Sequence, residues 1–157
     1  MFLRFLGGLW RFLPGWLRRR TARLAQARFT VTVGAFIFDE HRRILLLDHV
    51  FRPDDGWGVP GGFIGKHEQP ETALRRELQE EIGIELEQVQ ILFVRTLYAA
   101  QQIEIYFVAK AIGDPAPRSF EIKKAQWFST NKLPPTLSKD QRRIIDRATK
   151  ILEKTFA

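Results

Sequence analysis

The sequence predicts an α/β sandwich formed by a single domain. Short apolar runs with strand-like alternation stand before and after one strongly periodic helical segment, and a second helical pattern closes the chain. With 157 residues, of which 45% are hydrophobic and 27% charged, the chain can bury one sizeable core and leaves little room for a second. Strands mixed with helices favour a sandwich over a helical bundle or a β-barrel.

The expected strands and loops follow from alternation and from turn-forming residues. Residues 51–69 are rich in Gly, Pro and Asp and are predicted as a long loop that holds one short strand near 57–60, and loops of this length are usually functional. The other strands are expected at 29–38, 44–50, 85–98, 101–112 and 121–128, with a turn at 39–43 between the first two.

Two helices are expected in the body of the chain. The clearer one has Pro70 at a first helical position and Gly83 where a helix would stop. Its apolar stripe comes from Leu74, Leu78 and Ile82, which recur every four residues. A second helix is expected near 138–154, with Ser138 as its candidate N-cap.

The positive charge of the chain is concentrated at its N-terminus. The chain has 25 basic and 18 acidic residues, and residues 1–38 hold seven arginines and no acid, so removing those seven leaves 18 residues of each sign. The excess charge therefore belongs to the N-terminal segment and not to the rest of the domain. We expect residues 1–27 to form a basic amphipathic helical extension and residues 28–157 to form the folded domain.

Residues 2–17 have a broad apolar face rich in Phe, Leu and Trp opposite Arg4, Arg11 and Arg18. Pro14 favours two short helices with a bend over one rod. Arginines, Gly and Pro interrupt the apolar run too often for a spanning helix, and a signal peptide or a mitochondrial presequence fits less well. We expect peripheral contact of residues 2–23 with an anionic membrane surface, and packing on the domain or in a homodimer remains the alternative.

The absence of cysteine excludes disulfides, zinc–thiolate sites, iron–sulfur clusters and cysteine nucleophiles. It also fits a reducing compartment. The expected location is therefore cytoplasmic, with association to the inner membrane surface through the extension.

The helix near 70–82 carries a cluster of carboxylates. Glu77, Glu80 and Glu81 fall within an arc of about 100° beside the leucine stripe. Like charges at these spacings repel unless a cation neutralises them, and hard divalent cations such as Mg²⁺ or Mn²⁺ prefer such oxygen ligands. A solvated acidic face is the alternative, but the glycine-rich run Trp57–Gly62 before the helix favours a site, because backbone groups there can approach an anion or a metal closely.

The run from Gly62 to Ile84, GFIGKHEQPETALRRELQEEIGI, resembles the signature of the Nudix hydrolases, G-x5-E-x7-REUxEExGU, where U is a bulky aliphatic residue. It matches at every fixed position. The stretches WGVPGG before it and QWFSTNKLP after it also resemble family landmarks, so the resemblance covers about residues 29–150. It implies a Nudix-type α/β/α sandwich with a mixed sheet.

The resemblance further implies hydrolysis of a nucleoside diphosphate linked to another group, with Mg²⁺ or Mn²⁺ as cofactor and a small nucleotide as substrate. By similarity, Glu77, Glu80 and Glu81 would bind the metal together with the backbone carbonyl of Gly61. One carboxylate of the cluster would be the general base, and the sequence leaves open which one. Arg76 would orient the glutamates.

Other candidates stand outside the helix. Glu68 would ligate or anchor the loop. Glu121 is the first candidate for a further ligand or base, with a surface salt bridge as the alternative, and Glu104 is the second. Arg52 is a candidate for binding the substrate's phosphates, and Phe36, Phe38, Trp57 and Tyr106 are candidates for stacking on a base, with core packing expected for the first two. His49 is expected as a strand residue without a chemical role.

Three functional hypotheses remain open at this point. The leading one is a metal-dependent pyrophosphohydrolase. The second is a nucleotide-binding module without turnover. The third uses the arginine-rich N-terminus to direct the protein to RNA ends or caps, although no specific nucleic-acid partner is expected.

Overall fold

The computed structural model describes residues 14–52 and 56–155. Two sheets form the centre of the domain: a mixed four-stranded sheet in the order β4-β1-β6-β5 and an antiparallel three-stranded sheet in the order β3-β2-β7. The strands are β1 Thr30–Ile37, β2 Arg43–His49, β3 Trp57–Gly58, β4 Gly61–Phe63, β5 Glu85–Leu97, β6 Gln102–Ile112 and β7 Ile122–Ser129. The described helices are α2 Gly15–Ala25, α3 Pro70–Ile82 and α4 Lys139–Thr155.

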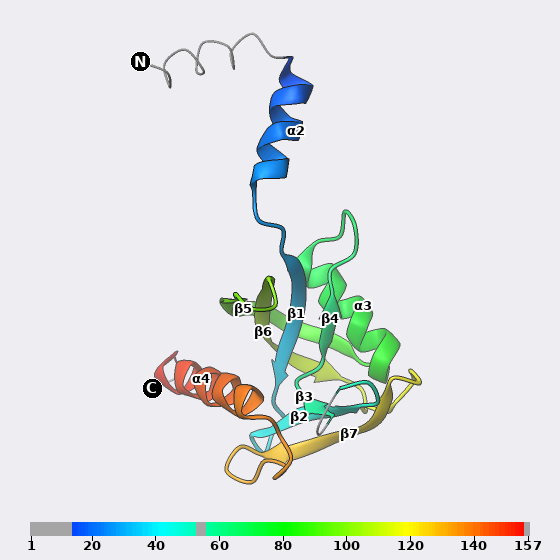
Figure 1. Cartoon of the computed structure of the whole chain (residues 1–157). Helices are drawn as coiled ribbons and strands as arrows, with labels where there is room; N and C mark the ends of the chain where they lie inside the picture. The colour runs from blue at the N-terminus through cyan, green and yellow to red at the C-terminus, as the bar shows by residue number, and fades with distance from the viewer. Residues whose placement is uncertain (1–13, 53–55, 156–157) are drawn as a thin grey trace.

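Helices α3 and α4 cover opposite sides of the sheets, which makes the predicted α/β/α sandwich (Figure 1). In β1, Ala35 and Ile37 pack with the apolar stripe of α3, whereas Phe36 packs with residues of α4. Successive strand residues face opposite sides, so a strand between two helices needs apolar residues on both faces. This explains the continuous apolar runs of β1 and β2.

The helix boundaries agree closely with the expected signals. Gly83 ends α3 in the left-handed conformation, with φ at 71°, and its N–H donates to the carbonyl oxygens of Leu78 and Gln79. The Ser138 hydroxyl accepts a hydrogen bond of 3.1 Å from the Gln141 N–H at the start of α4. Both are the local capping interactions that the sequence predicted.

The loop before α3 differs from the prediction. It contains two short strands instead of one, and β4 was not expected. β3 pairs with β2 while β4 pairs with β1, so the segment passes from one sheet to the other. A three-residue strand that contains two glycines has no alternation to detect, and only its partner strand defines it.

Helix α2 begins directly after Pro14, at the predicted break, and continues to Ala25, within the helical extension expected over residues 1–27. It stands away from the domain, with Trp16 and Leu24 exposed (Figure 1). Residues 2–13, which carry most of the predicted amphipathic pattern, lie outside the described residues. Within the described part of the chain, no helix has both the length and the apolar character that crossing a membrane requires.

We expect Gly61→Ala to destabilise the domain. Gly61 has φ at 148°, and a Cβ there would lie 2.7 Å from the Gly34 Cα atom and 2.9 Å from the Val33 carbonyl carbon. These backbone atoms belong to β1 and cannot move without disturbing the β1–β4 pairing. The free energy of unfolding should fall by about 2 kcal/mol or more, measured by urea denaturation. An unchanged denaturation midpoint would contradict this packing.

Candidate active site

The carboxylates of α3 lie on one face of the helix but in different surroundings. Glu81 is buried, Glu77 is largely covered and Glu80 is exposed. Two of them extend toward the glycine run that ends β3 and forms β4, since the Glu77 carboxylate lies over Gly62 and the Glu81 carboxylate accepts a hydrogen bond from the backbone of Gly61. Helix and glycine loop therefore form one site.

Glu81 is the unusual member of this group. Burial raises the pKa of its carboxyl to about 7, and the neighbouring charge of Glu77 acts in the same direction. The positive charge of Arg52 and the hydrogen bond from Gly61 lower the pKa and offset part of this rise. The Oε2 atom of Glu81 is buried and has no hydrogen-bond partner among the described residues. A carboxyl that titrates near neutral pH can accept a proton there, as a general base must.

Arg76 contacts three carboxylates at once. Its Nε and Nη2 atoms donate to both oxygens of Glu68 at 2.9 and 3.0 Å. Its Nη1 atom lies 3.0 Å from a Glu77 oxygen and donates to Glu80 at 3.3 Å. The hydrogen bonds from Arg76, and one from the Gly65 N–H, lower the pKa of Glu68 to about 2. Glu68 thus anchors the loop, and the contacts of Arg76 are those of a residue that orients the glutamates.

The absence of a side chain at Gly62 leaves the space that the Glu77 carboxylate occupies. A Cβ on Gly62 would lie 2.6 Å from Glu77 Oε2. Because real Cβ atoms do not approach this closely, only glycine leaves room for the carboxylate against β4.

Arg52 and Glu121 approach the site from two other loops. The Arg52 guanidinium lies over Gly58, and its charge acts on both Glu81 and His49. The Glu121 carboxylate is close enough to contribute to the raised pKa of Glu81. Both side chains are exposed in part, so they can meet a ligand from solvent.

Glu104 lies elsewhere. It forms an ion pair with Arg95, and it accepts a hydrogen bond of 3.3 Å from Gln102. Arg95 also binds Asp140 of α4, which places the network on the face of the sheet opposite α3. The described part of the chain shows no contact of Glu104 with the carboxylates of α3, and the two are linked through Arg52, on which the charges of both Glu81 and Glu104 act.

The four aromatic candidates are divided by burial. Phe36 is completely buried in the core and Tyr106 is 4% exposed, so neither presents a free ring face. Trp57 and Phe38 are partly buried, and Trp57 packs edge to face with Phe128 at a centroid distance of 5.0 Å.

His49 was missed by the sequence reasoning. It ends β2, is buried, and its Nδ1 atom lies 4.0 Å from Glu81 Oε1. In residues 14–52 and 56–155 its Nε2 atom finds no hydrogen-bond partner. Burial, followed by the positive charge of Arg52, lowers its pKa to about 3, so the imidazole is neutral at physiological pH. The only signal in the sequence was a histidine at the end of an apolar strand, which does not reveal a partner on another element.

We expect His49 to make the metal-free protein sensitive to acid. Its folded pKa lies below the unfolded value of 6.5, so its contribution to stability is fully present above pH 6.5 and is lost as the pH falls toward 3. The loss is at most about 1.4 kcal/mol per pH unit. Urea denaturation in EDTA should show a weaker acid dependence for His49→Gln than for the parent. Parallel curves between pH 4 and 6.5 would contradict this expectation.

The carboxylates fit a divalent cation in their chemistry but are not closed around one. Oxygen donors suit a hard cation, and the unpartnered oxygen of Glu81 is available as a ligand. Glu77 and Glu80 are held by Arg76, and among residues 14–52 and 56–155 no three acidic or histidine side chains converge tightly enough to enclose a metal ion. The residue types and their common face thus fit a metal, although the cluster is not closed.

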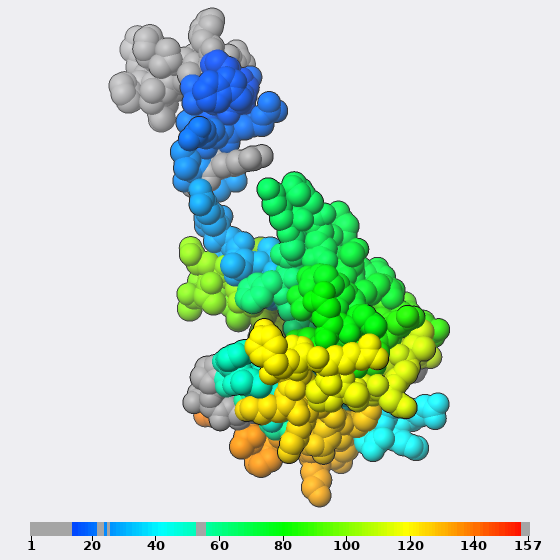
Figure 2. Space-filling view, turned by 90° about the vertical axis from the view of Figure 1, so that its right-hand side faces the viewer, coloured from blue at the N-terminus to red at the C-terminus, as the bar shows by residue number. Residues whose placement is uncertain are grey.

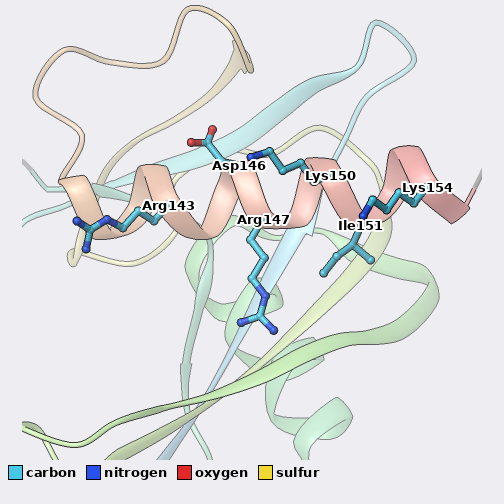
Figure 3. Close-up of a pocket in the computed structure, with 6 residues that line it drawn as sticks. All are labelled: Arg143, Asp146, Arg147, Lys150, Ile151 and Lys154. Atoms are coloured by element: carbon cyan, nitrogen blue, oxygen red, sulfur yellow. The ribbon is translucent and has the colours of Figure 1, made fainter.

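A separate pocket of about 440 Å³ runs along α4 (Figure 3). It is lined by Arg143, Asp146, Arg147, Lys150, Ile151 and Lys154. None of the α3 carboxylates lines it, so the pocket is distinct from the site described above.

Fold and site together define a class: an α/β/α sandwich with a carboxylate helix that follows a glycine-rich strand. A family model for the NUDIX domain matches residues 28–148. The chain belongs to the NUDIX family, whose hydrolases generally use divalent metal ions.

Several characterised proteins and solved structures are similar to the chain. NAD-capped RNA hydrolase NudC of Deinococcus radiodurans is 34% identical over 118 residues, which cover 72% of this chain and 42% of that protein. RNA pyrophosphohydrolase of Teredinibacter turnerae is 34% identical over 100 residues, covering 64% and 55%. The crystal structure of MutT NUDIX hydrolase from Burkholderia pseudomallei superposes with a TM-score of 0.68 at 31% identity, covering 76% of this chain and 97% of that one. The chain spans about half of the two curated relatives.

Proposed function

We propose that the protein is a metal-dependent pyrophosphohydrolase that cleaves the pyrophosphate bond of a nucleoside diphosphate linked to another group. The observation that carries this proposal is Glu81, a buried carboxyl with a pKa of about 7 and an unpartnered oxygen beside Glu77 and the glycine run. Family membership and the names of the relatives agree with this reaction class.

The metal would be Mg²⁺ or Mn²⁺. Glu77, Glu80 and Glu81, with the Gly61 carbonyl, would hold it, and Glu121 is the candidate for a further ligand. Bound there, the cation would neutralise phosphate charge and acidify a water molecule. Hydrolysis of a pyrophosphate depends mainly on positioning and on charge neutralisation, which such a site supplies.

The remaining residues have distinct tasks. One carboxylate of the cluster would accept the proton of the attacking water, and without metal Glu81 is the one whose pKa is raised, to about 7. Arg76 keeps Glu77 and Glu80 in position through its contacts with both. The Arg52 guanidinium lies over Gly58 and its charge acts on Glu81, so it is the candidate to pair with a substrate phosphate there.

A substrate screen tests the proposal. The purified protein is incubated with nucleoside triphosphates, nucleotide sugars, CDP-alcohols and dinucleoside polyphosphates, each with Mg²⁺, with Mn²⁺ or with EDTA, and the products are separated by chromatography. We expect metal-dependent cleavage of at least one class to a nucleoside monophosphate. Binding without turnover of any compound would instead identify a nucleotide-binding module.

RNA ends form the second candidate substrate, favoured by the basic pocket of α4 and by the names of two relatives. A 5′-triphosphorylated oligonucleotide and its NAD-capped form would be added to the same screen. If the N-terminal arginines direct the protein to RNA, replacing Arg18, Arg19 and Arg20 with Gln should weaken RNA binding and spare hydrolysis of small nucleotides. Equal RNA affinity would contradict a role for these arginines.

The N-terminal extension supports a further proposal on location: cytoplasmic, at the inner membrane surface. Arg18, Arg19 and Arg20 are exposed on α2 together with Trp16 and Leu24, and cations beside apolar groups are typical of interfacial helices. Sedimentation with anionic and with neutral vesicles tests it. Failure of the whole protein to sediment with anionic vesicles at low salt would leave self-packing or a homodimer, which gel filtration distinguishes.

A further inference from the structure

Two phenylalanine rings are exposed together at the surface. Phe51 follows β2 and Phe120 precedes β7, and their side chains are 68% and 79% exposed. The two rings are 6.0 Å apart between centroids and meet edge to face at 79°. A pair of aromatic rings in contact with each other and open to water is an unusual surface feature, because aromatic side chains gain most from burial.

The loop that carries Phe120 is hydrogen-bonded to the candidate active site. The N–H groups of Arg118 and Ser119 donate to the backbone carbonyl of Glu81 at 2.8 and 3.4 Å. In the space-filling view the yellow segment that leads into β7 crosses the face beside the green helix α3 (Figure 2). Phe120 therefore lies one residue from a direct contact with the buried glutamate.

The loop that carries Phe51 is hydrogen-bonded to the loop that carries Phe120. The Val50 N–H donates to the Glu121 carbonyl at 2.8 Å, so the residues adjacent to the two rings are joined by a backbone hydrogen bond. The following residue, Arg52, and the neighbour of Phe120, Glu121, both act electrostatically on Glu81. The aromatic pair thus belongs to the two loops that bring Arg52 and Glu121 to the site.

Cations outnumber acids on the described residues next to the two rings. Arg52 follows Phe51, and Lys123 and Lys124 follow Phe120 by three and four residues on exposed positions of β7. Glu121 directly follows Phe120, and Lys123 lies 3.9 Å from Asp48. Every nucleobase offers a flat π-face, and an aromatic ring near phosphate-binding cations is a common way to hold one. The separate pair of Trp57 and Phe128 is partly buried against α4, so it does not compete for the same solvent-facing position.

We propose that Phe51 and Phe120 form a stacking platform for a nucleobase. This base belongs to the group attached to the nucleoside diphosphate, across the scissile pyrophosphate from the nucleoside. The inference rests on the proposed function and narrows its substrate class: the group attached to the nucleoside diphosphate itself carries a base, as in a dinucleotide or at the 5′ end of a polynucleotide. A substrate with a bare sugar or phosphate in that position leaves the platform without a partner.

Binding of two matched ligands tests the platform. Diadenosine diphosphate and ADP-ribose share the adenosine and both phosphates, and only the first has a second base. Dissociation constants are measured by equilibrium dialysis in EDTA, so that no turnover occurs and phosphate repulsion affects both ligands alike. We expect the whole protein to bind diadenosine diphosphate about 5- to 150-fold more tightly than ADP-ribose, which is the range that stacking of one base contributes.

The double variant Phe51→Ala/Phe120→Ala should lose this preference, whereas Phe51→Tyr, which keeps a ring, should retain it. Tyr98→Ala is the matched control, because Tyr98 is an aromatic residue 84% exposed in the turn between β5 and β6. The inference is overturned if the parent shows no preference, binds neither ligand, or keeps its preference in the double variant.

Hydrolysis of diadenosine diphosphate with Mg²⁺ is recorded separately. Loss of the ligand preference in the double variant, combined with no turnover by the parent, would support the platform and contradict the proposed reaction. Turnover by the parent with equal preference in both proteins would support the reaction and overturn the platform.

Discussion

Glu81→Gln is expected to lower turnover at least ~10²-fold on the best substrate found in the screen. The substitution keeps the size of the side chain but removes a carboxylate that can bind a cation and accept a proton near neutral pH. Steady-state rates with saturating Mg²⁺ measure the effect, and Glu71→Gln is a matched control, since Glu71 lies exposed in the first turn of the same helix and pairs with Arg75. Parental rates in Glu81→Gln would refute the assignment of the site.

The same substitution should stabilise the metal-free protein. The folded pKa of Glu81, about 7, lies above its unfolded value of 4.5, so proton binding favours the folded state. That contribution is fully present below pH 4.5 and is lost as the pH rises through 7, by about 3 kcal/mol at most. Urea denaturation in EDTA should show the advantage of Glu81→Gln growing over this interval. A constant difference would mean that Glu81 titrates normally.

Gly62→Ala is expected to lower turnover by about 10²-fold while leaving the fold intact. The added Cβ would occupy the position of the Glu77 carboxylate, and a misplacement of about 1 Å at a reacting centre can have an effect of this size. The carboxylate ends a flexible side chain, so it can move aside without disturbing the backbone. Because the substitution leaves the charge of the site unchanged, it tests the effect of the position of the Glu77 carboxylate alone.

Gly61→Ala provides the comparison for Gly62→Ala. Its added Cβ meets the backbone of β1 and should reduce stability, whereas Gly62→Ala should leave the urea midpoint within about 0.5 kcal/mol of the parent. If Gly62→Ala unfolds the protein, the loss of activity has no bearing on Glu77. If it keeps both stability and activity, the position of Glu77 is not critical.

Most elements of the fold could be predicted because their signals are local. The apolar stripe and the caps of α3, the alternation of β5 and β6, and the Ser138 cap of α4 each depend on residues a few positions apart. Strand β4 could not be predicted in this way, because two glycines and a phenylalanine become a strand only through their pairing with β1.

The candidate site divides along the same line. The sequence by itself determined the carboxylate helix, its glycine-rich approach and the family, because these are contiguous in the chain. Only the tertiary structure decided that Glu81 is buried while Glu80 is exposed, and that His49 lies against Glu81. It also decided that Glu104 pairs with Arg95 and that the ring of Phe51 contacts the ring of Phe120. Burial and pairing depend on which distant segments come together, and the pKa of a carboxyl follows from that environment and not from its position in a motif.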